Sequence, residues 1–279
     1  MVFKGMEYKD RSGDEALIDQ LLEDDRWVFQ QKFDGTRAMI HLDDLTVTQR
    51  NGKPLKHTAA TQWLPAIRQE LRSFLGLVGT RAILDCELII ETGHIYIFDV
   101  VDPDNTAQPL SSRLDRLEEL NDTISVQRLQ SGFGLSIHVV DSHYLPERKR
   151  ALVEACRDRE GVVAKKLSAP YHSGIRTPDV LKLKNTHTAD LVVLSLSTSP
   201  LSAGLGFINP DGSQVTISRA SMIGKDPSIK VGDVVEVDYL AWTGASLLQP
   251  RIIKKRFDKD ARSCNMAQFA PYSRKVARL

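Results

Sequence analysis

A change of pattern near residues 184–188 constrains the fold of this chain more than any other feature of its sequence. Up to that point, stretches with helical periodicity alternate with short β-branched and aromatic runs. After Asn185, no convincing helix pattern occurs for roughly seventy residues, and short β runs recur between Gly, Pro, Asp and Ser. Because many short strands separated by turns are typical of a small β-barrel, the sequence predicts two domains, residues 1–186 and 187–279.

The first part combines helix and strand patterns. Helices with an apolar stripe are expected at Asp14–Asp25, where Asp14 is the candidate N-cap, and at Thr61–Leu75. Two further helices are expected at Ser111–Leu129 and Pro146–Arg159. The strand patterns of this part are 27–30, 40–42, 45–48, 82–90, 95–100, 135–140, 161–165 and 180–184.

The composition is that of an ordinary soluble globular protein, with 42% hydrophobic and 26% charged residues among 279. No apolar run approaches the ~20 residues that span a bilayer, and Met1–Glu7 lacks the apolar core of a signal peptide. Cys86, Cys156 and Cys264 are far apart, odd in number and without metal-ligand spacing. We therefore expect an intracellular, reducing location and no structural zinc.

Basic residues gather at the C-terminal end, although the net charge is only +1. The stretch Arg251–Leu279 contains nine Lys or Arg and two Asp. Such a stretch is either a solvated tail or a surface that binds the phosphate backbone of a nucleic acid.

The most unusual local feature is the stretch Gln31–Arg37, which follows the expected strand Trp27–Gln30. It places Lys32 at the end of a buried strand, beside a glycine turn. Burial disfavours the ammonium form of a lysine, which is one way in which a lysine amine becomes a nucleophile. Arg37 could then clamp a phosphate, and Asp34 could orient the amine or a metal-bound group. The alternative is a charged hairpin tip, because Asp-Gly is a common turn between strands.

Other charged or aromatic residues also allow two interpretations. Asp85 and Glu87 share one face of an apolar strand, so they face either a polar cavity, a bound cation or solvent at a sheet edge. Lys182 and Lys184 likewise share a face, which is either a site or an exposed edge. Phe98 is either a core residue or a platform for a base.

The order of these stretches resembles that of the motifs of covalent nucleotidyltransferases, specifically the ATP-dependent DNA ligases, over most of the chain. The matching stretches are Lys32–Arg37, Arg50–Gly52, Leu84–Leu88, Tyr96–Asp99, Glu160–Val163, Lys182–Lys184 and Arg256–Lys259. One such match would be weak, but seven in the right order are specific.

The resemblance implies a fold and an activity. The fold is of the α+β class: a nucleotidyltransferase (adenylation) domain of antiparallel sheets with flanking helices, followed by an OB-fold β-barrel. The activity is DNA ligation in three nucleotidyl transfers. Lys32 attacks the α-phosphate of ATP and holds AMP, AMP passes to the 5′-phosphate of a nick, and the 3′-hydroxyl displaces it.

The resemblance also implies site residues, cofactors and partners. The implied catalytic residues are Lys32, Asp34, Lys182 and Lys184. The implied nucleotide-binding residues are Gln30, Gln31, Lys32, Arg37, Arg50, Glu87, Phe98, Glu160, Lys182, Lys184, Arg256, Asp258 and Lys259. The implied ligands of Mg²⁺, or of Mn²⁺ in its place, are Asp34, Glu87 and Glu160. The implied partner is nicked double-stranded DNA, bound by a monomer without a membrane or an obligatory protein partner.

Two positions depart from the family pattern. Gln30 stands where the family often has an acid that reads adenine, and Cys86 stands where glycine is common. The alternatives within the superfamily are an mRNA-capping guanylyltransferase, although Glu160-Gly161 is closer to the ligase form, and an RNA ligase, which usually lacks the barrel. An NAD-dependent ligase is disfavoured, because the chain lacks its extra N-terminal and zinc modules. A non-catalytic DNA-binding module is a further alternative, and labelling with ATP would test it.

Overall fold

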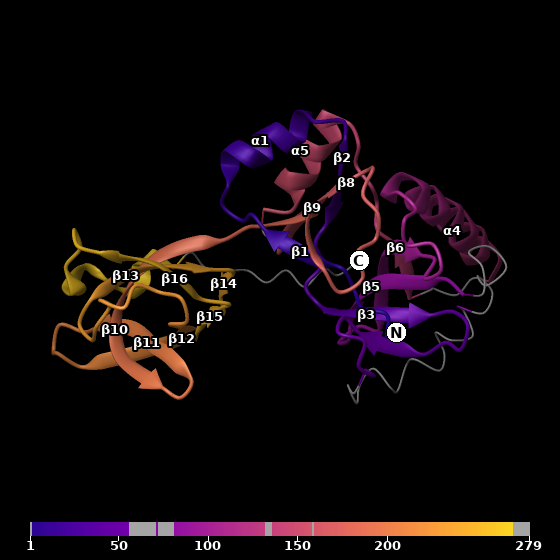
Figure 1. Cartoon of the computed structure of the whole chain (residues 1–279). Coiled ribbons are helices and arrows are strands. Elements are labelled where there is room, and N and C mark those ends of the chain that lie inside the picture. The colour runs from indigo at the N-terminus through magenta and orange to yellow at the C-terminus, as the bar shows by residue number, and fades with distance from the viewer. Residues whose placement is uncertain (1, 56–70, 72–80, 132–135, 158, 270–279) are drawn as a thin grey trace. The chain divides into compact units, whose positions relative to one another are not determined.

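The computed structural model describes residues 2–55, 71, 81–131, 136–157 and 159–269 (Figure 1). The chain divides into two compact units, Met1–Lys184 and Asn185–Leu279. The predicted helix at Thr61–Leu75 lies outside the described residues, except for Leu71. Among the helices of the described ranges, none is long and apolar enough to cross a membrane.

The N-terminal unit contains a four-stranded sheet in the order β1-β9-β8-β2. Its strands are β1 (Glu7–Asp10), β2 (Trp27–Gln31), β8 (Gly161–Lys166) and β9 (Arg176–Lys184). The pairs β2–β8 and β8–β9 are antiparallel, and β1 pairs with β9 in parallel. The three strands β2, β8 and β9 were predicted, whereas β1 was not, because the polar run Glu7–Asp10 has no apolar alternation.

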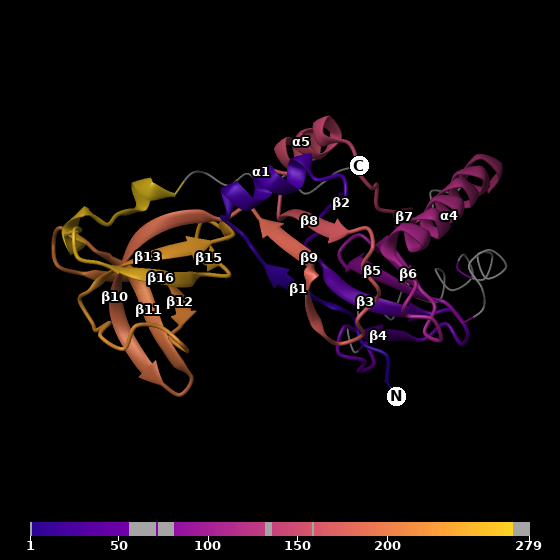
Figure 2. The ribbon, with the colours of Figure 1, turned by 45° about the horizontal axis from the view of Figure 1, so that its top comes forward.

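Two helices, α1 (Glu15–Glu23) and α5 (Pro146–Ala155), lie beside this sheet (Figure 2). The Asp14 side chain accepts a hydrogen bond of 3.2 Å from the backbone nitrogen of Leu17, which confirms the predicted N-cap of α1. Leu21 and Leu22 of α1 pack with Phe29 of β2 in a buried cluster. This cluster holds the strand that leads to Lys32.

A second sheet of the same unit has five strands in the order β4-β3-β5-β6-β7. Its strands are β3 (Thr36–His41), β4 (Val47–Gln49), β5 (Ile83–Ile89), β6 (His94–Val101) and β7 (Ile137–Val139). The long helix α4 (Leu110–Ser131) contacts β6 and β7, and Leu114 and Leu117 pack with Ile95 of β6 in the largest apolar core of this unit. The opposite face of β6 is therefore the one that carries Tyr96.

The C-terminal unit is built from strands, as its sequence pattern predicts. Its five-stranded sheet has the order β12-β11-β10-β13-β16. The strands are β10 (His187–Thr198), β11 (Leu201–Ile208), β12 (Gln214–Ser221), β13 (Val234–Tyr239) and β16 (Arg251–Arg256), with a small hairpin of β14 (Ala241–Trp242) and β15 (Leu247–Leu248). The edge strands β12 and β16 also contact each other, so the sheet curls toward closure. Two 3-10 turns follow, η1 (Ala261–Ser263) and η2 (Met266–Gln268).

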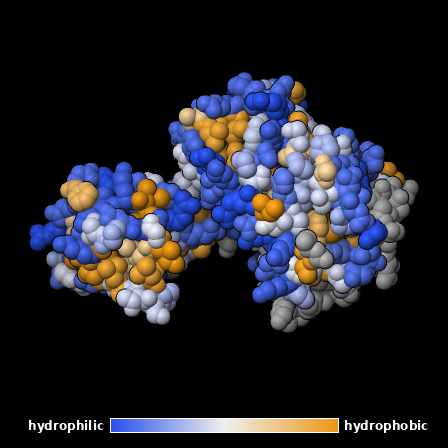
Figure 3. Space-filling view, viewed as in Figure 1, coloured by the Kyte–Doolittle hydropathy of each residue, from blue (hydrophilic) through white to orange (hydrophobic). Residues whose placement is uncertain are grey.

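The surface of the C-terminal unit combines polar and apolar areas. On the face drawn in Figure 3, apolar residues gather over β10 and β11. Leu196 and Leu201 flank the turn between these strands and are about half exposed, at 46% and 47%. Phe257 is 85% exposed beside Arg256. A single exposed apolar residue such as Phe257 is normal on a folded surface.

Candidate active site

The loop Lys32–Gly35 joins the two sheets of the N-terminal unit. It leaves β2 in the four-stranded sheet and enters β3 in the five-stranded sheet. The alternative of an Asp-Gly hairpin tip is therefore wrong, because the two flanking strands do not pair with each other. The backbone nitrogen of Lys32 donates to the carbonyl of Gly161 at 2.9 Å, which fixes the start of the loop beside β8.

Gly35 fits this crossing because it has no side chain. A Cβ atom at this position would lie 2.4 Å from the backbone oxygen of Leu88, which is closer than real Cβ contacts. The Gly35 nitrogen also donates to Oε1 of Glu87 at 3.2 Å. The close approach of the loop to β5 therefore needs a glycine and brings Glu87 to the loop.

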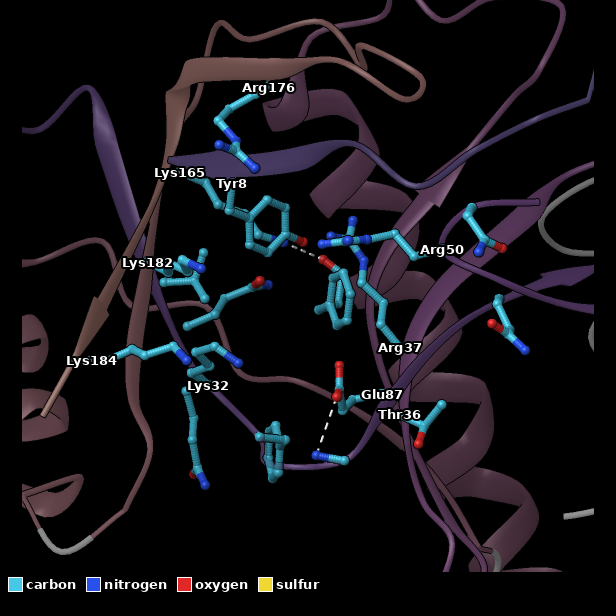
Figure 4. A pocket seen from close by; sticks show the side chains of 18 residues that line it. Tyr8, Lys32, Thr36, Arg37, Arg50, Glu87, Lys165, Arg176, Lys182 and Lys184 are labelled. Carbon is cyan, nitrogen blue, oxygen red and sulfur yellow. Dashed lines mark hydrogen bonds between the residues drawn. The ribbon is translucent and has the colours of Figure 1, made fainter. Parts of the chain in front are cut away.

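The loop borders a pocket of about 420 Å³ to which both sheets contribute. Figure 4 shows Lys32, Lys182 and Lys184 on one side of it, Glu87 and Thr36 on the other, and Tyr8 and Arg176 at one end. The lining residues are Tyr8, Gln30, Gln31, Lys32, Phe33, Gly35, Thr36, Arg37, Gln49, Arg50, Asn51, Glu87, Phe98, Val163, Lys165, Arg176, Lys182 and Lys184. This wall carries seven Lys or Arg residues and one carboxylate, so the pocket suits an anionic ligand.

A buried carboxylate joins two of the lysines. Nζ of Lys32 lies 2.7 Å from Oε2 of Glu160, and Nζ of Lys184 lies 3.3 Å from Oε1 of the same residue. Glu160 is only 8% exposed, so this pairing offsets the cost of burying its charge. Lys182 pairs with Asp10 of β1 at 3.5 Å. The two lysines of β9 lie on a central strand, so the alternative of an exposed sheet edge is wrong.

Asp85 and Glu87 lie on the central strand β5, not at a solvent-facing edge, and their partners differ. Asp85 is fully buried and accepts two hydrogen bonds from Arg37, at 2.8 and 2.6 Å, and one of 2.6 Å from the Tyr171 hydroxyl. The positive charge that compensates the buried carboxylate of Asp85 is thus the guanidinium of Arg37. That guanidinium also donates to the carbonyl of Met6 at 2.7 Å, and Arg37 lines the pocket, so its contact with a phosphate stays a prediction.

Glu87 is the carboxylate of the pocket wall. Burial raises the pKa of Glu87 from 4.5 to about 7, against the opposing charges of Lys32 and Arg37. The nearby charge of Glu160 adds to the rise, and the hydrogen bond from Gly35 reduces it. A carboxyl group with such a pKa changes its charge in the physiological range, which is common for residues of functional sites.

Phe98 occupies a β-bulge. Asp85 pairs with Asp99 and Cys86 pairs with Ile97, so Phe98 has no partner across the ladder. A bulge re-aims a side chain, and here the ring lines the pocket. Nζ of Lys165 donates to the Phe98 carbonyl at 2.8 Å and lies 4.7 Å from the centre of the Phe98 ring. Burial lowers the pKa of Lys165 to about 8.

Gln30 enters the pocket wall from β2 and is 1% exposed. Its Nε2 donates to the hydroxyl of Ser142 at 3.0 Å. Its Oε1 has no hydrogen-bond partner within the described part of the chain. A buried acceptor without a partner costs free energy, so it marks a position where a ligand can donate a hydrogen bond.

The predicted metal ligands do not form a ready-made cluster. Among the described residues, no group of three or more His, Cys, Asp or Glu side chains is placed to hold a metal ion. Glu87 lines the pocket. Glu160 is paired with Lys32 and Lys184 and is not among the lining residues. Asp34 is exposed on the loop and is not among the lining residues either. The structure therefore does not bring the three acids together as the ligands of one ion.

The residues of the last motif lie in the C-terminal unit. Arg256 donates to both carboxylate oxygens of Asp258, at 2.8 and 2.7 Å, and to Asp190 at 3.0 Å. The hydrogen bond from Arg256 lowers the pKa of Asp258. Lys259 lies 3.5 Å from Asp190. These side chains form one charged cluster at the end of β16, and they are not among the residues that line the pocket.

Four pocket residues lie outside the matching stretches and have no role in the sequence-based hypothesis: Tyr8, Gln49, Lys165 and Arg176. Lys165 could have been predicted from its spacing, because it lies two residues after Val163 of a matching stretch and therefore on the same face of β8. Both side chains line the pocket. Tyr8 lies on the unpredicted strand β1, where the Arg37 guanidinium sits 4.2 Å from its ring centre. Arg176 pairs with Glu7 at 2.9 Å, and no local pattern distinguishes it from a surface arginine.

Comparison with known proteins gives both a family and a fold. A profile of the RNA ligase family matches residues 25–184, which is more than half of the chain. The chain is similar to DNA ligase 1 of Korarchaeum cryptofilum (strain OPF8), with 27% identity over 216 residues that cover 65% of this chain and 37% of that protein. The match thus spans little more than a third of that relative's length.

Two of the solved structures that are similar to the chain illustrate its fold. One is the ligase domain of LigD from M. tuberculosis, with 18% identity, a TM-score of 0.52, and coverage of 94% of this chain and 98% of that one. The other comes from a study of Lig E DNA ligases, with 18% identity, a TM-score of 0.57, and coverage of 91% and 99%. These likenesses establish a ligase-type nucleotidyltransferase fold that is rich in sheets and has few helices. By its matching profile and its fold, the chain belongs to the RNA ligase family of nucleotidyltransferases.

Proposed function

We propose that this protein is an ATP-dependent DNA ligase that acts through a lysyl-AMP intermediate. The observation that carries the proposal is the position of Lys32. Its amine reaches a cationic pocket, lies 2.7 Å from the buried carboxylate of Glu160, and is flanked by Lys184 on the same carboxylate. A nucleophile next to a proton acceptor, in a site that suits phosphates, is the arrangement that nucleotidyl transfer requires.

In the first transfer, the Lys32 amine attacks the α-phosphate of ATP. The N–P bond forms, the bond to pyrophosphate breaks, and Glu160 is placed to accept the proton that the ammonium must lose. Lys184 and Lys182 neutralise negative charge that develops on the phosphate. AMP then passes to the 5′-phosphate of the nick with release of Lys32, and the 3′-hydroxyl displaces AMP to form the phosphodiester bond.

The pocket suits ATP and a divalent cation. The unpaired Oε1 of Gln30 can accept a hydrogen bond from the adenine amino group, and the Phe98 ring can stack on the base. Mg²⁺ commonly binds through one or two carboxylates together with substrate phosphates, so Glu87 and Glu160 would suffice as protein ligands without a third acid. When bound, the ion would neutralise charge on the phosphates.

The C-terminal unit supports DNA as the substrate. We assign it as the OB-fold domain, because its curled five-stranded sheet has edge strands that contact each other. Its last motif supplies Arg256, Asp258 and Lys259, to which we assign the orientation of pyrophosphate in the first transfer only. The relative from K. cryptofilum is named a DNA ligase, and we extend that substrate to this chain.

The proposal is tested by mass spectrometry and by nick sealing. Incubation with ATP and magnesium should add one AMP at Lys32, and Lys32→Ala should abolish the adduct. DNA and RNA nicks should be compared with ATP, NAD and GTP tested separately. Sealing of only the RNA nick would favour RNA ligation, the second candidate that the RNA ligase profile supports. If Lys32 forms no adduct with any of the three nucleotides, both DNA ligation and RNA ligation through this lysine would be refuted.

The assignment of the last motif has its own test. Lys259→Ala and Arg256→Ala should fail to form enzyme–AMP, yet should seal a nick whose 5′-phosphate already carries AMP, because pyrophosphate takes no part in that step. Lys32→Ala is the control, since it too needs the pre-adenylated nick. If the Arg256 and Lys259 variants lose enzyme–AMP formation and sealing of the pre-adenylated nick equally, these residues would be assigned to DNA binding instead.

A further inference from the structure

All three nitrogens of the Arg256 guanidinium bond to carboxylates of the C-terminal unit. Nε and Nη2 donate to the two oxygens of Asp258 at 2.8 and 2.7 Å. Nη1 donates to Asp190 of β10 at 3.0 Å and to Glu236 of β13 at 3.2 Å. Asp258 belongs to the same motif as Arg256, whereas Asp190 and Glu236 lie outside the seven matching stretches. Because a guanidinium donates from a rigid planar fork, contacts to all three nitrogens fix its plane.

Asp190 and Glu236 lie directly opposite each other in the β10–β13 ladder. Like charges at such a position destabilise a sheet. Their side chains are only 16% and 21% exposed, so solvent screens the repulsion weakly. Nη1 of Arg256 bridges the two carboxylates, and Lys254 and Lys259 add longer contacts of 3.3 and 3.5 Å to one acid each. Arg256 is thus the charge shared by both acids of the pair.

The main chain of Asp190 is also held in place. Its backbone nitrogen donates to Oε1 of Gln268 at 2.8 Å, and its carbonyl accepts from Nε2 of Gln268 at 3.1 Å. Gln268 lies in η2, which follows the last motif. The acid that receives Nη1 is therefore fixed by elements before and after Arg256 in the chain. Supporting hydrogen bonds of this kind keep a functional side chain in one orientation.

The charges of this cluster balance. Three cations are paired with three carboxylates: Arg256, Lys254, Lys259, Asp190, Glu236 and Asp258. A cluster without net charge attracts a distant polyphosphate only weakly. We therefore expect the cluster to act through the direction of the Arg256 guanidinium and not through its total charge.

We infer that Asp190 and Glu236 are positioning residues of the first nucleotidyl transfer, because they hold the guanidinium of Arg256 in the orientation that meets the departing pyrophosphate. The inference rests on the proposed role of Arg256 in that transfer. In this role neither acid touches the nucleotide, and both act through Arg256. An arginine that is already held in place loses little freedom when it binds a phosphate, which lowers the barrier of the step.

The test measures two steps in the full-length chain: enzyme–AMP formation from ATP, and sealing of a nick whose 5′-phosphate already carries AMP. Glu236→Gln and Asp190→Asn keep the shape of each side chain and remove its charge. Each should slow enzyme–AMP formation by about tenfold or more, the worth of one hydrogen bond to a charged group. Each should change sealing of the pre-adenylated nick by less than about twofold, because pyrophosphate takes no part in that step.

Thermal unfolding, followed by circular dichroism, tests the holding contact independently of activity. In the wild-type background, Glu236→Gln should lower the melting temperature by about 2–4 °C, because Arg256 and Lys254 lose a partner. In the Arg256→Ala background, the same change should raise the melting temperature by a similar amount. There it removes one of two facing carboxylates that have lost their shared cation.

Asp233→Asn is the matched control. Asp233 pairs at 2.7 Å with Lys255, the residue before Arg256 on β16, so this ion pair does not include Arg256. The variant should lower the melting temperature but leave the ratio of the two rates unchanged.

Three results would overturn the inference while adenylation of Lys32 stands. Glu236→Gln and Asp190→Asn could slow both steps equally, they could slow neither step, or the melting temperature could change in the same direction in both backgrounds. If the wild-type chain forms no adduct with ATP, or if Arg256→Ala still forms it at the wild-type rate, the proposed function or the proposed role of Arg256 fails first, and the inference fails with it.

Discussion

Replacing Glu87 by glutamine should separate stability from activity. The pKa of this carboxyl group rises from 4.5 to about 7 because the folded chain buries it. A raised pKa means that the folded state binds the proton more tightly than the unfolded state. Its contribution to stability is therefore fully present below pH 4.5 and is lost as the pH rises through about 7.

The magnitude follows from the two pKa values. Their difference corresponds to roughly 3 kcal/mol of folding free energy between pH 4 and pH 8, and this is an upper value because Glu87 is not fully buried. Glutamine has a similar shape and no charge. Glu87→Gln should therefore gain stability relative to the wild type as the pH rises, while nucleotidyl transfer at pH 8 falls by orders of magnitude.

The assay is urea unfolding of the full-length wild type and variant at pH 5 and pH 8, followed by fluorescence. Glu91→Gln is the matched control, because Glu91 is exposed in the turn after the same strand. A difference in unfolding free energy between wild type and Glu87→Gln that does not change with pH would refute the buried-charge argument. Wild-type nick sealing by Glu87→Gln would refute its role in the pocket.

Three further changes test the architecture of the N-terminal unit. Gly35→Ala should destabilise the chain by about 1–3 kcal/mol in urea unfolding and block adenylation, because its Cβ would collide with the Leu88 carbonyl. Lys165→Met should lower the free energy of unfolding by about 1–3 kcal/mol, because it leaves the Phe98 carbonyl unpaired. The lowered pKa of Lys165 predicts that the free energy of unfolding of the wild type rises between about pH 8 and 10.5, and this rise should be absent from the variant. Lys149→Met, which removes the buried ammonium bonded to two carbonyls at the end of α1, should cost a similar amount in thermal unfolding and leave enzyme–AMP formation intact.

The parts of the fold that the sequence predicts are those with strong local patterns. The cap at Asp14, the strand before Lys32 and the strand with Lys182 and Lys184 follow from periodicity and from propensity alone. Two-residue spacing also places both lysines of β9 on the pocket side, where Lys184 meets Glu160. Local rules suffice here because neighbours in the chain decide the structure.

The parts that escape prediction depend on contacts distant in sequence. Strand β1 is polar and exists because β9, about 170 residues away, offers it a parallel partner. The bulge at Phe98 arises from the register between β5 and β6, which no single strand encodes. The pairing of Arg37 with Asp85 on the neighbouring strand β5 likewise cannot be read from the motif that contains Arg37.

The crossing of the lysine loop between the sheets also sets a mechanical limit. The four residues Lys32–Gly35 are a tether whose contour length is at most about 14 Å. Its ends are pinned by the bond from Lys32 to Gly161 on one side and by the bond from Gly35 to Glu87 on the other. The sheets therefore cannot spread apart at the nucleophile. Any widening of the pocket must therefore be a hinge rotation of one sheet relative to the other, with Lys32 close to the hinge axis.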